Sequence, residues 1–314
     1  MTIRDFLRRL LPPKGLQALR GIRRRSSHFR LFLRSKILRA FRWPMPPIAD
    51  GIWYELQFKP AEALKYYGIP VPGLPPDDVQ IRFTGRTSQD NLEQAFSFYQ
   101  YVCRVCQLNK INSPKVLDFG GGWGRIARLF LRDTKPELIT VADCLSDSIK
   151  WLRMTSNPCN IIKNDPFPPI VGLDAGYDVI YAFSVFSHLS EKYLNAWVDY
   201  LITYLRPGAR LVITTRGHHF IDSLKRRHSE GIVDDLTKTL PNPEEVSARY
   251  AKGEFQFYPT GGGGELDSDF YGETLIPRVY FEKKYGSQLV NFTEDVENVD
   301  QAIVVLRKRT VLTE

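Results

Sequence analysis

The chain has 314 residues, 43% of them apolar and 25% charged, and this length can bury one large hydrophobic core or two small ones. No stretch approaches the roughly 18 consecutive apolar residues of a membrane-spanning helix, and the first residues hold no apolar run typical of a secretory signal, so we expect a cytoplasmic protein. The four cysteines are too few for a disulfide framework. Cys103-x-x-Cys106 lacks the second Cys or His pair of a zinc site, so we expect it to pack within a helix and predict no metal site.

Residues 1–42 form a strongly basic arm. They contain thirteen Lys and Arg against one acid, Asp5, and carry +12, whereas residues 43–314 carry −4. Apolar residues recur at helical spacing on both sides of Pro12-Pro13, which predicts amphipathic helices. Such an arm could adsorb on the anionic inner face of a membrane or dock on an acidic partner; a loosely ordered basic leader and an organelle transit peptide stay open. Because the positive charge lies in the arm and not on the body, it argues against nucleic acid as a partner.

Residues 43–88 form a proline-rich segment. Eight prolines lie between Pro44 and Pro76, together with several aromatic residues, and this composition predicts a connector that wraps the folded body. From Leu92 to Cys106 the apolar residues return to helical spacing. A helix is therefore expected to lead into the main domain, residues 89–314.

The main domain alternates between strand and helix patterns. Strands are predicted at 115–119, 138–143, 160–163, 177–183 and 210–215, and helices at 124–132, 147–154 and 191–205. Such alternation predicts an α/β fold with a parallel sheet covered by helices on both faces. Two further strand patterns, 288–292 and 301–308, have no room for a helix between them, so we expect an antiparallel hairpin at the sheet edge.

A glycine-rich turn follows the first strand, with Gly120, Gly122 and Gly124 leading into a helix. Glycines are needed where the backbone turns sharply and a ligand approaches main-chain atoms, so this turn is expected to hold a nucleoside cofactor. The spacing also fits the dinucleotide pattern, which is weak by itself. Asp118 favours a different cofactor, because a carboxylate two residues before the first glycine would repel a pyrophosphate but attract a sulfonium amino acid.

A second carboxylate, Asp143, ends the next strand, nineteen residues after Gly124. A carboxylate at this place can accept hydrogen bonds from both ribose hydroxyls of the cofactor. The alternative is a helix N-cap, and the glycine turn at the matching distance favours the ribose.

With these residues in view, the sequence resembles the class I S-adenosylmethionine-dependent methyltransferases over about residues 90–308. Asp118-x-Gly120-x-Gly122-x-Gly124 is similar to motif I of that family, and Asp143 to the acid that ends its second strand. The stretches that agree further are Asn164 to Pro169, Tyr181 to Leu189 and Leu205 to Ala209. The resemblance implies a Rossmann-like three-layer sandwich with a seven-stranded, mostly parallel sheet in the order 3-2-1-4-5-7-6, S-adenosylmethionine as cofactor, and cofactor contacts at Asn164, Asp165 and Phe183.

Two other segments, Arg82 to Gly85 and Asp269 to Tyr285, resemble a bacterial branch that methylates small molecules or sugars. For transfer to a hydroxyl, the protein must remove a proton, and histidine is the natural base near neutral pH. His188 follows the fourth strand, and His218 with His219 follow the fifth, so these three are the candidate catalytic residues; helix packing is the alternative for His188.

About seventy residues, 217–286, separate the fifth strand from the terminal hairpin, which is far more than a connection needs. We expect this insertion to be a cap over the acceptor. Its four-glycine run at Gly261 could be the hinge of a lid. Side chains that could bind a polyhydroxylated acceptor, or simply form the core of the cap, are Tyr258, Asp267, Asp269, Tyr271 and Glu273.

Three functions are therefore in competition. The first is methyl transfer to a hydroxyl of a small molecule or glycan. The second is a nucleic-acid or protein methyltransferase guided by the arm; it is weakened because Phe183-Ser184-Val185-Phe186 stands where base-methylating enzymes of this fold carry Asp/Asn-Pro-Pro-aromatic. The third is a non-catalytic cofactor-binding subunit, since a glycine turn predicts binding and not turnover.

Overall fold

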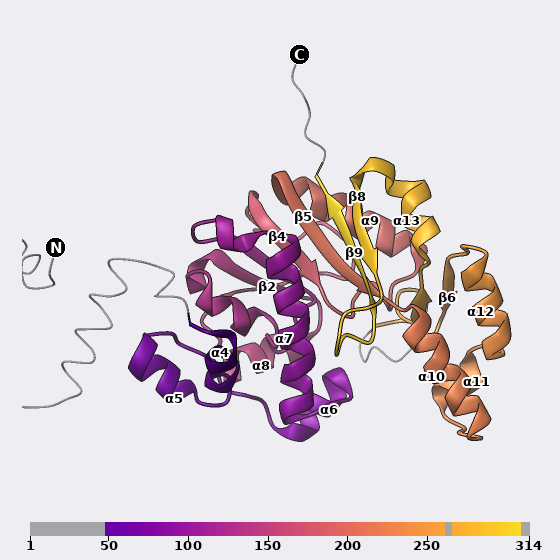
Figure 1. Ribbon diagram of the computed structural model, residues 1–314, viewed down its shortest axis with the longest axis horizontal. Helices are drawn as coiled ribbons and strands as arrows, with labels where there is room; N and C mark the ends of the chain where they lie inside the picture. The colour runs from indigo at the N-terminus through magenta and orange to yellow at the C-terminus, as the bar shows by residue number, and fades with distance from the viewer. Residues whose placement is uncertain (1–47, 261–265, 309–314) are drawn as a thin grey trace, which may run out of the picture.

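The computed structural model describes residues 48–260 and 266–308. Its centre is a seven-stranded sheet in the order β3-β2-β1-β4-β5-β9-β8, which confirms the predicted topology (Figure 1). The strands are β1 (Val116–Phe119), β2 (Ile139–Asp143), β3 (Asn160–Lys163), β4 (Tyr177–Ala182), β5 (Leu205–Thr215), β8 (Leu289–Thr293) and β9 (Ala302–Arg307). The first five are parallel, and β9 pairs antiparallel with both β5 and β8, as the predicted hairpin requires.

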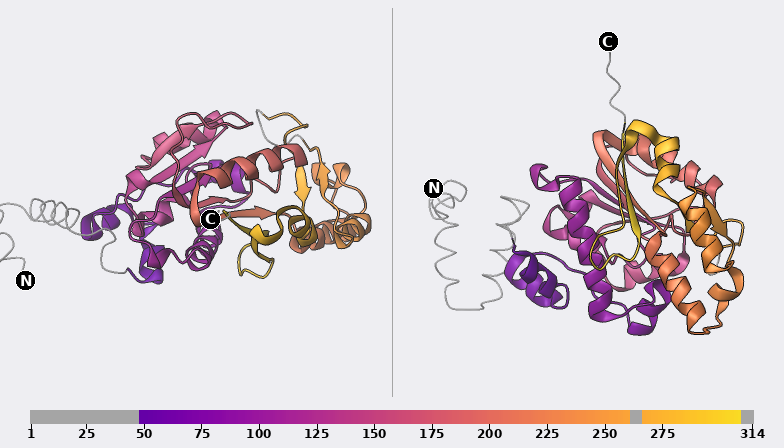
Figure 2. Two further views of the ribbon diagram at one scale, coloured as in Figure 1. Left: turned by 90° about the horizontal axis from the view of Figure 1, so that it is seen from above. Right: turned by 45° about the vertical axis from the view of Figure 1, so that its right-hand side comes forward.

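Helices cover both faces of the sheet, which gives the three layers of a Rossmann-like sandwich (Figures 1 and 2). On one face the core includes residues of α7 (Ser88–Val105), η4 (Ala127–Arg132) and α8 (Ser146–Met154). On the other it includes α9 (Glu191–Tyr204) and α13 (Arg278–Tyr285). Strands β1, β2 and β4 are buried along their whole length, because they lie between these two layers.

Two of the boundaries predicted within residues 115–308 differ from the structure by more than one residue. Gly124 has a φ of +84°, so helical backbone starts only after it, as the short 3-10 helix η4. Strand β5 starts at Leu205 rather than at 210, because the predicted Pro-Gly turn lies inside it: Tyr177 pairs with Leu205 but Val179 pairs with Arg210. The chain between Leu205 and Arg210 is accommodated as an irregularity in the ladder.

The described part of the proline-rich segment is held on the body by a buried arginine. It contains α4 (Asp50–Leu56), α5 (Pro60–Glu62), η2 (Ala63–Tyr67) and α6 (Asp77–Thr84). Arg128 is fully buried, and its guanidinium donates to the backbone carbonyls of Gln57 and Pro72, both at 2.8 Å. The indole of Trp53 also donates to the Leu129 carbonyl, at 2.9 Å. The arm, residues 1–42, lies outside the described residues.

The insertion after β5 has a small core of its own. It contains α10 (His218–Ser229), α11 (Asp235–Thr239), α12 (Pro243–Ala251) and the hairpin of β6 (Gln256–Tyr258) and β7 (Glu273–Leu275). Phe220, Val246 and Tyr250 pack together there. These elements lie at the opposite end of the molecule from α4 and α5 (Figures 1 and 2). Helix α13, at the end of the predicted range 217–286, instead packs with the core of the sheet.

Three short 3-10 helices complete the structure: η3 (Leu108–Lys110), η5 (Pro136–Leu138) and η6 (Gly286–Gln288). Within the described ranges, no helix has both the length and the apolar character needed to cross a membrane.

Candidate functional site

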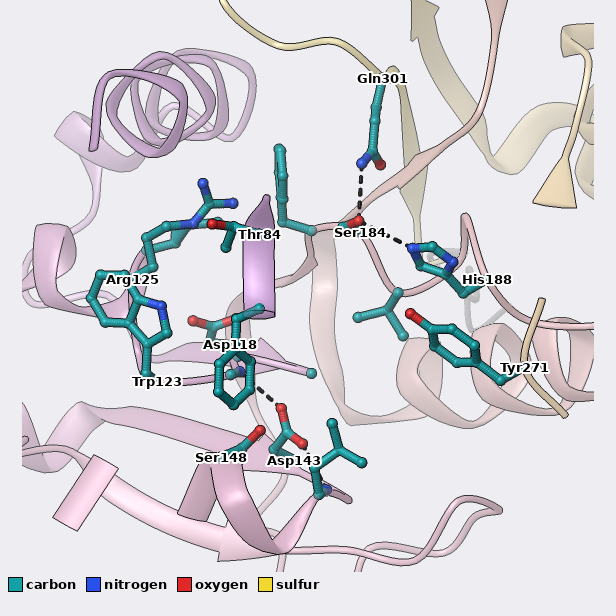
Figure 3. A pocket seen from close by; sticks show the side chains of 18 of the residues that line it. Thr84, Asp118, Trp123, Arg125, Asp143, Ser148, Ser184, His188, Tyr271 and Gln301 are labelled. Atoms are coloured by element: carbon teal, nitrogen blue, oxygen red, sulfur yellow. Dashed lines mark hydrogen bonds between the residues drawn. The ribbon is translucent and has the colours of Figure 1, made fainter. Parts of the chain in front are cut away.

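A cavity of about 620 Å³ lies at the carboxyl ends of β1, β2, β4 and β5. This is where the strand order reverses direction, between β1 and β4, and where open α/β sheets bind their ligands. The walls come from the loops after those strands, from the end of α6, from the insertion and from the residues before β9. Segments far apart in the sequence therefore meet around one space (Figure 3).

The glycine turn after β1 forms the floor of the cavity. Gly120 has a φ of +70°, and a Cβ placed on it would lie 2.3 Å from Cγ2 of Val185, in the loop after β4. The backbone N–H of Gly120 donates to the Ala142 carbonyl at 2.7 Å. Only glycine fits such a close approach at this φ, so the predicted turn is held tightly against the second and fourth strands.

Asp118 is the next-to-last residue of β1, just before this turn, and its exposed fraction is 2%. Its Oδ2 is buried and has no hydrogen-bond partner in the described part of the chain. Burial raises the pKa of this carboxyl to about 7, because a charge is poorly solvated there. A buried carboxyl that lines a cavity fits a ligand that brings a positive charge.

Asp143 ends β2, and its carboxylate is fixed by the backbone on two sides. One oxygen accepts from the Gly122 N–H and the other from the Leu145 N–H, both at 2.8 Å. Burial raises its pKa. Asp143 also lines the cavity, so its carboxylate is placed to accept a hydroxyl such as a ribose would supply.

The other predicted cofactor residues divide into two groups. Phe183 lines the cavity, with the guanidinium of Arg125 over its ring at 5.0 Å. Asn164 and Asp165 do not line it: Asn164 is buried, its amide donates to the Asp165 carbonyl at 2.8 Å, and the Asp165 side chain is exposed. A cofactor contact at Asn164 or Asp165 stays a prediction.

Of the three candidate histidines, the structure brings only His188 to the cavity. Its Nδ1 lies 2.8 Å from the Gly272 carbonyl, and its Nε2 lies 3.5 Å from the Ser184 hydroxyl. Burial lowers the pKa of His188 to about 4. The ring stacks on Tyr271, with centroids 4.6 Å apart, and both side chains face the cavity in Figure 3.

His218 and His219 begin α10 outside the residues that line the cavity. The backbone N–H of His218 donates to a carboxylate oxygen of Glu294 at 2.6 Å, and Nε2 of His219 lies 3.1 Å from the Glu294 carbonyl. The backbone of His218 and the side chain of His219 therefore contact Glu294, and the ring of His218 packs on Tyr250 with centroids 5.0 Å apart.

Only some of the candidate cap residues lie at the cavity. Tyr271 lines the cavity, and Glu273 lies beside it, 3.6 Å from Nδ1 of His188 and 2.8 Å from Nε of Arg216. Tyr258 is buried in the core of the insertion, and neither Asp267 nor Asp269 lines the cavity. The glycine run 261–264 lies outside the described residues.

Sequence reasoning missed the polar residues that surround His188. Ser184, Arg216 and Gln301 line the cavity, and Thr214 lies behind them. Ser184 lies within the stretch Tyr181 to Leu189 that resembles the family, but nothing in the sequence connects it with Gln301, which is 117 residues away. Within the described ranges, no group of three or more His, Cys, Asp or Glu could hold a metal ion.

Comparison with known proteins agrees with this geometry. A family model described as "Methyltransferase domain" matches residues 88–248, about half of the chain. The biotin biosynthesis bifunctional protein BioCD of Bordetella avium is 30% identical over 145 residues, a match that covers 46% of this chain. The match spans only 30% of that protein's length.

Solved structures that resemble this chain include two bacterial enzymes. One is an S-adenosylmethionine-dependent methyltransferase from Clostridium acetobutylicum, with a TM-score of 0.46 and 11% identity over 68% of this chain and 92% of that one. The other is the 1,6-didemethyltoxoflavin-N1-methyltransferase of Burkholderia thailandensis with S-adenosylhomocysteine bound, with a TM-score of 0.44 and 11% identity over 85% and 93%.

Proposed function

Because this chain belongs to the methyltransferase domain family, we propose that it uses S-adenosylmethionine to methylate a hydroxyl group of a small molecule or glycan. The observation that carries the proposal is the position of His188. It is a neutral imidazole with an unprotonated nitrogen, at the wall of the cavity whose floor is formed by Asp118 and the glycine turn.

The residues at the floor fit the cofactor. Asp118 and Asp143 both line the cavity; Asp118 can accept from the ammonium group of the methionine part, and Asp143 can accept from the ribose hydroxyls. The glycine turn lets the cofactor approach main-chain atoms. When bound, S-adenosylmethionine supplies an electrophilic methyl group on a sulfonium centre.

His188 acts on the acceptor side in this proposal. The Gly272 carbonyl can only accept a hydrogen bond, so Nδ1 of His188 carries a proton and Nε2 is free to receive the proton that methylation releases. The Glu273 carboxylate, 3.6 Å from Nδ1, stabilises the positive charge that then forms on the ring. Val185, Leu266 and Phe270 line the same space and help to exclude water.

A binding experiment tests the cofactor half of the proposal. Calorimetric titration of the full chain with S-adenosylmethionine should show saturable binding, and titration with NAD should show none. Asp118→Asn and Asp143→Asn should each weaken binding of S-adenosylmethionine by about tenfold or more, because each removes a charged hydrogen-bond acceptor. Asp174→Asn is the matched control, since this acid is 86% exposed at a distant surface.

A transfer experiment tests the acceptor half. The protein is incubated with methyl-labelled S-adenosylmethionine and, in separate reactions, with a pool of nucleotide sugars and glycans, a pool of other small metabolites, RNA, and proteins. The proposal expects label in one of the first two pools and its loss in His188→Asn. Label in RNA or protein would contradict the proposed acceptor and indicate a nucleic-acid or protein methyltransferase. Label in none of the pools would favour a subunit that binds the cofactor without turnover.

A further inference from the structure

A chain of hydrogen bonds leads from β5 to His188, and its direction is fixed. The backbone N–H of Ser184 donates to Oγ1 of Thr214 at 2.7 Å. The Thr214 hydroxyl donates to Oε1 of Gln301 at 2.6 Å, which fixes the orientation of the Gln301 amide. The amide Nε2 of Gln301 then donates to Oγ of Ser184 at 3.0 Å (Figure 3).

These three hydrogen bonds do not determine which acceptor the hydroxyl hydrogen of Ser184 binds. Oγ accepts from Gln301, so Ser184 must donate elsewhere, and the acceptors in range are Nε2 of His188 at 3.5 Å and Oγ of Ser187 at 3.4 Å. Nδ1 of His188 is committed as a donor to the Gly272 carbonyl. Nε2 is therefore left with a lone pair that can accept the hydroxyl hydrogen of Ser184.

The backbone of Ser184 is strained in a way that supports a role beyond packing. Its φ is +59°, which is costly for a residue with a Cβ, on the order of 1–3 kcal/mol. Thr214 is fully buried and Gln301 is nearly so, so the groups that hold Ser184 in this conformation are rigid. Ser184, His188 and Gln301 all line the cavity.

We propose that Ser184 is a further catalytic residue, which takes the proton of the acceptor hydroxyl while passing its own proton to Nε2 of His188; this rests on the proposed function. Gln301 and Thr214 are positioning residues. In this step the acceptor oxygen forms a bond to the methyl carbon, and the bond from that carbon to sulfur breaks. The acceptor proton moves to Oγ of Ser184, and the Ser184 proton moves to His188, which becomes an imidazolium.

Charged groups on neighbouring elements face the histidine ring. Glu273 of β7 lies 3.6 Å from Nδ1 and favours the imidazolium. Arg216, after β5, binds the same carboxylate at 2.8 Å and opposes it. Tyr271 stacks on the ring face. Because none of these contacts involves Ser184, a change at Ser184 should alter Nε2 of His188 and leave Nδ1 unchanged.

Ser184→Gly is the decisive variant. Glycine adopts a φ of +59° without strain, so this change removes the hydroxyl and does not disturb the backbone. Ser187→Ala is the matched control, because it removes the competing hydroxyl from the same loop. Two further variants are Ser184→Ala, which also removes the hydroxyl, and Gln301→Met, which removes the amide that donates to it.

The test has a spectroscopic part that needs no acceptor. The full chain, with ¹⁵N-labelled histidine and S-adenosylhomocysteine bound, is studied by NMR. The Nε2 resonance of His188 should shift in Ser184→Gly and Gln301→Met, and stay in place in Ser187→Ala. An unchanged Nε2 resonance in Ser184→Gly would overturn the relay, even if the transfer experiment had succeeded.

The kinetic part uses the pool that accepts label from the wild-type protein. Ser184→Gly should lower the rate of transfer by about a hundredfold, the usual range for a proton-transfer group, while the Kd for S-adenosylmethionine stays within about twofold. A lower thermal midpoint with an unchanged rate would show that the network is structural only. If no pool accepts label, the proposed function fails, and the NMR result then tests only the hydrogen bond between Ser184 and His188.

Discussion

The buried carboxylate of Asp118 lowers the stability of the free protein, while its charge favours binding of the cofactor. Its pKa, raised to about 7, lies above the ordinary value of 3.8, so the folded protein holds this proton more tightly than the unfolded chain does. The free energy of unfolding therefore falls as pH rises from about 4 to about 7. A bound cation can recover this loss, which is the arrangement expected of a binding site rather than of a structural acid.

Asp118→Asn should separate the two effects. Without the buried charge, the free energy of unfolding at pH 8 should increase by on the order of 2 kcal/mol, while affinity for S-adenosylmethionine falls. In the wild-type protein the Kd should be about tenfold weaker at pH 6 than at pH 8, because protonation below pH 7 removes the charge. Urea unfolding and calorimetry at both pH values measure this. A pH-independent Kd in the wild type would contradict a role for the Asp118 charge.

The pKa of His188 predicts the acid limit of the reaction. Burial lowers this pKa to about 4, so the imidazole is unprotonated at every pH well above that value. The transfer rate of the wild-type protein should stay level from pH 8 down to about 5 and fall below it, apart from the loss of cofactor affinity, which saturating S-adenosylmethionine removes. A rate that halves near pH 6.5 would indicate a solvated histidine as the base.

At the scale of elements, the glycine turn and the loop after β4 form one unit. Gly120→Ala places a Cβ 2.3 Å from Val185 and should abolish cofactor binding, because the loop after β4 must move. Gly176→Ala is the matched control: its φ is +86°, but nothing lies within 4 Å of a Cβ there. Each variant should lose about 1 kcal/mol of stability from the backbone strain, and only Gly120→Ala should lose binding in calorimetry.

The attachment of the segment before α7 to the body depends on Arg128. Arg128→Met removes the donors of two buried carbonyls, at Gln57 and Pro72, and should lower the free energy of unfolding by about 3 kcal/mol. Limited proteolysis should then cut between these two residues before the sheet is attacked. Arg104→Met, on the exposed side of α7, is the control and should resist the protease as the wild type does. Equal resistance of both variants would contradict the clamp.

At the scale of the whole molecule, the charge is divided between the arm and the body. Residues 1–42 carry +12 and the rest −4, so we expect the arm to be the part that binds anionic membranes. Each basic residue near such a surface contributes about 1 kcal/mol. Removing residues 1–42 should abolish co-sedimentation with vesicles of anionic phospholipid in 0.1 M salt and leave the Kd for S-adenosylmethionine within about twofold. If the protein without residues 1–42 still binds the vesicles, residues 43–314 and not the arm are responsible for binding.

Much of the fold was readable from local patterns. Strand and helix periods predicted a parallel sheet covered on both faces and an antiparallel hairpin at its edge, whereas the order of the strands came from the resemblance to the methyltransferase family. Asp118, Asp143 and the glycine turn were found because they lie close together in the sequence and each needs a particular backbone or charge. The acid at the end of β2 is a short-range signal of the same kind.

The surroundings of His188 were decided only by the tertiary structure. Three histidines followed suitable strands, but only His188 lines the cavity, whereas the backbone of His218 and the side chain of His219 contact Glu294. Gln301 and Thr214 carry no local pattern, because their role consists of contacts between β4, β5 and the turn before β9. Hydrogen-bond direction and burial depend on neighbours distant in the chain, and a periodic pattern does not record them.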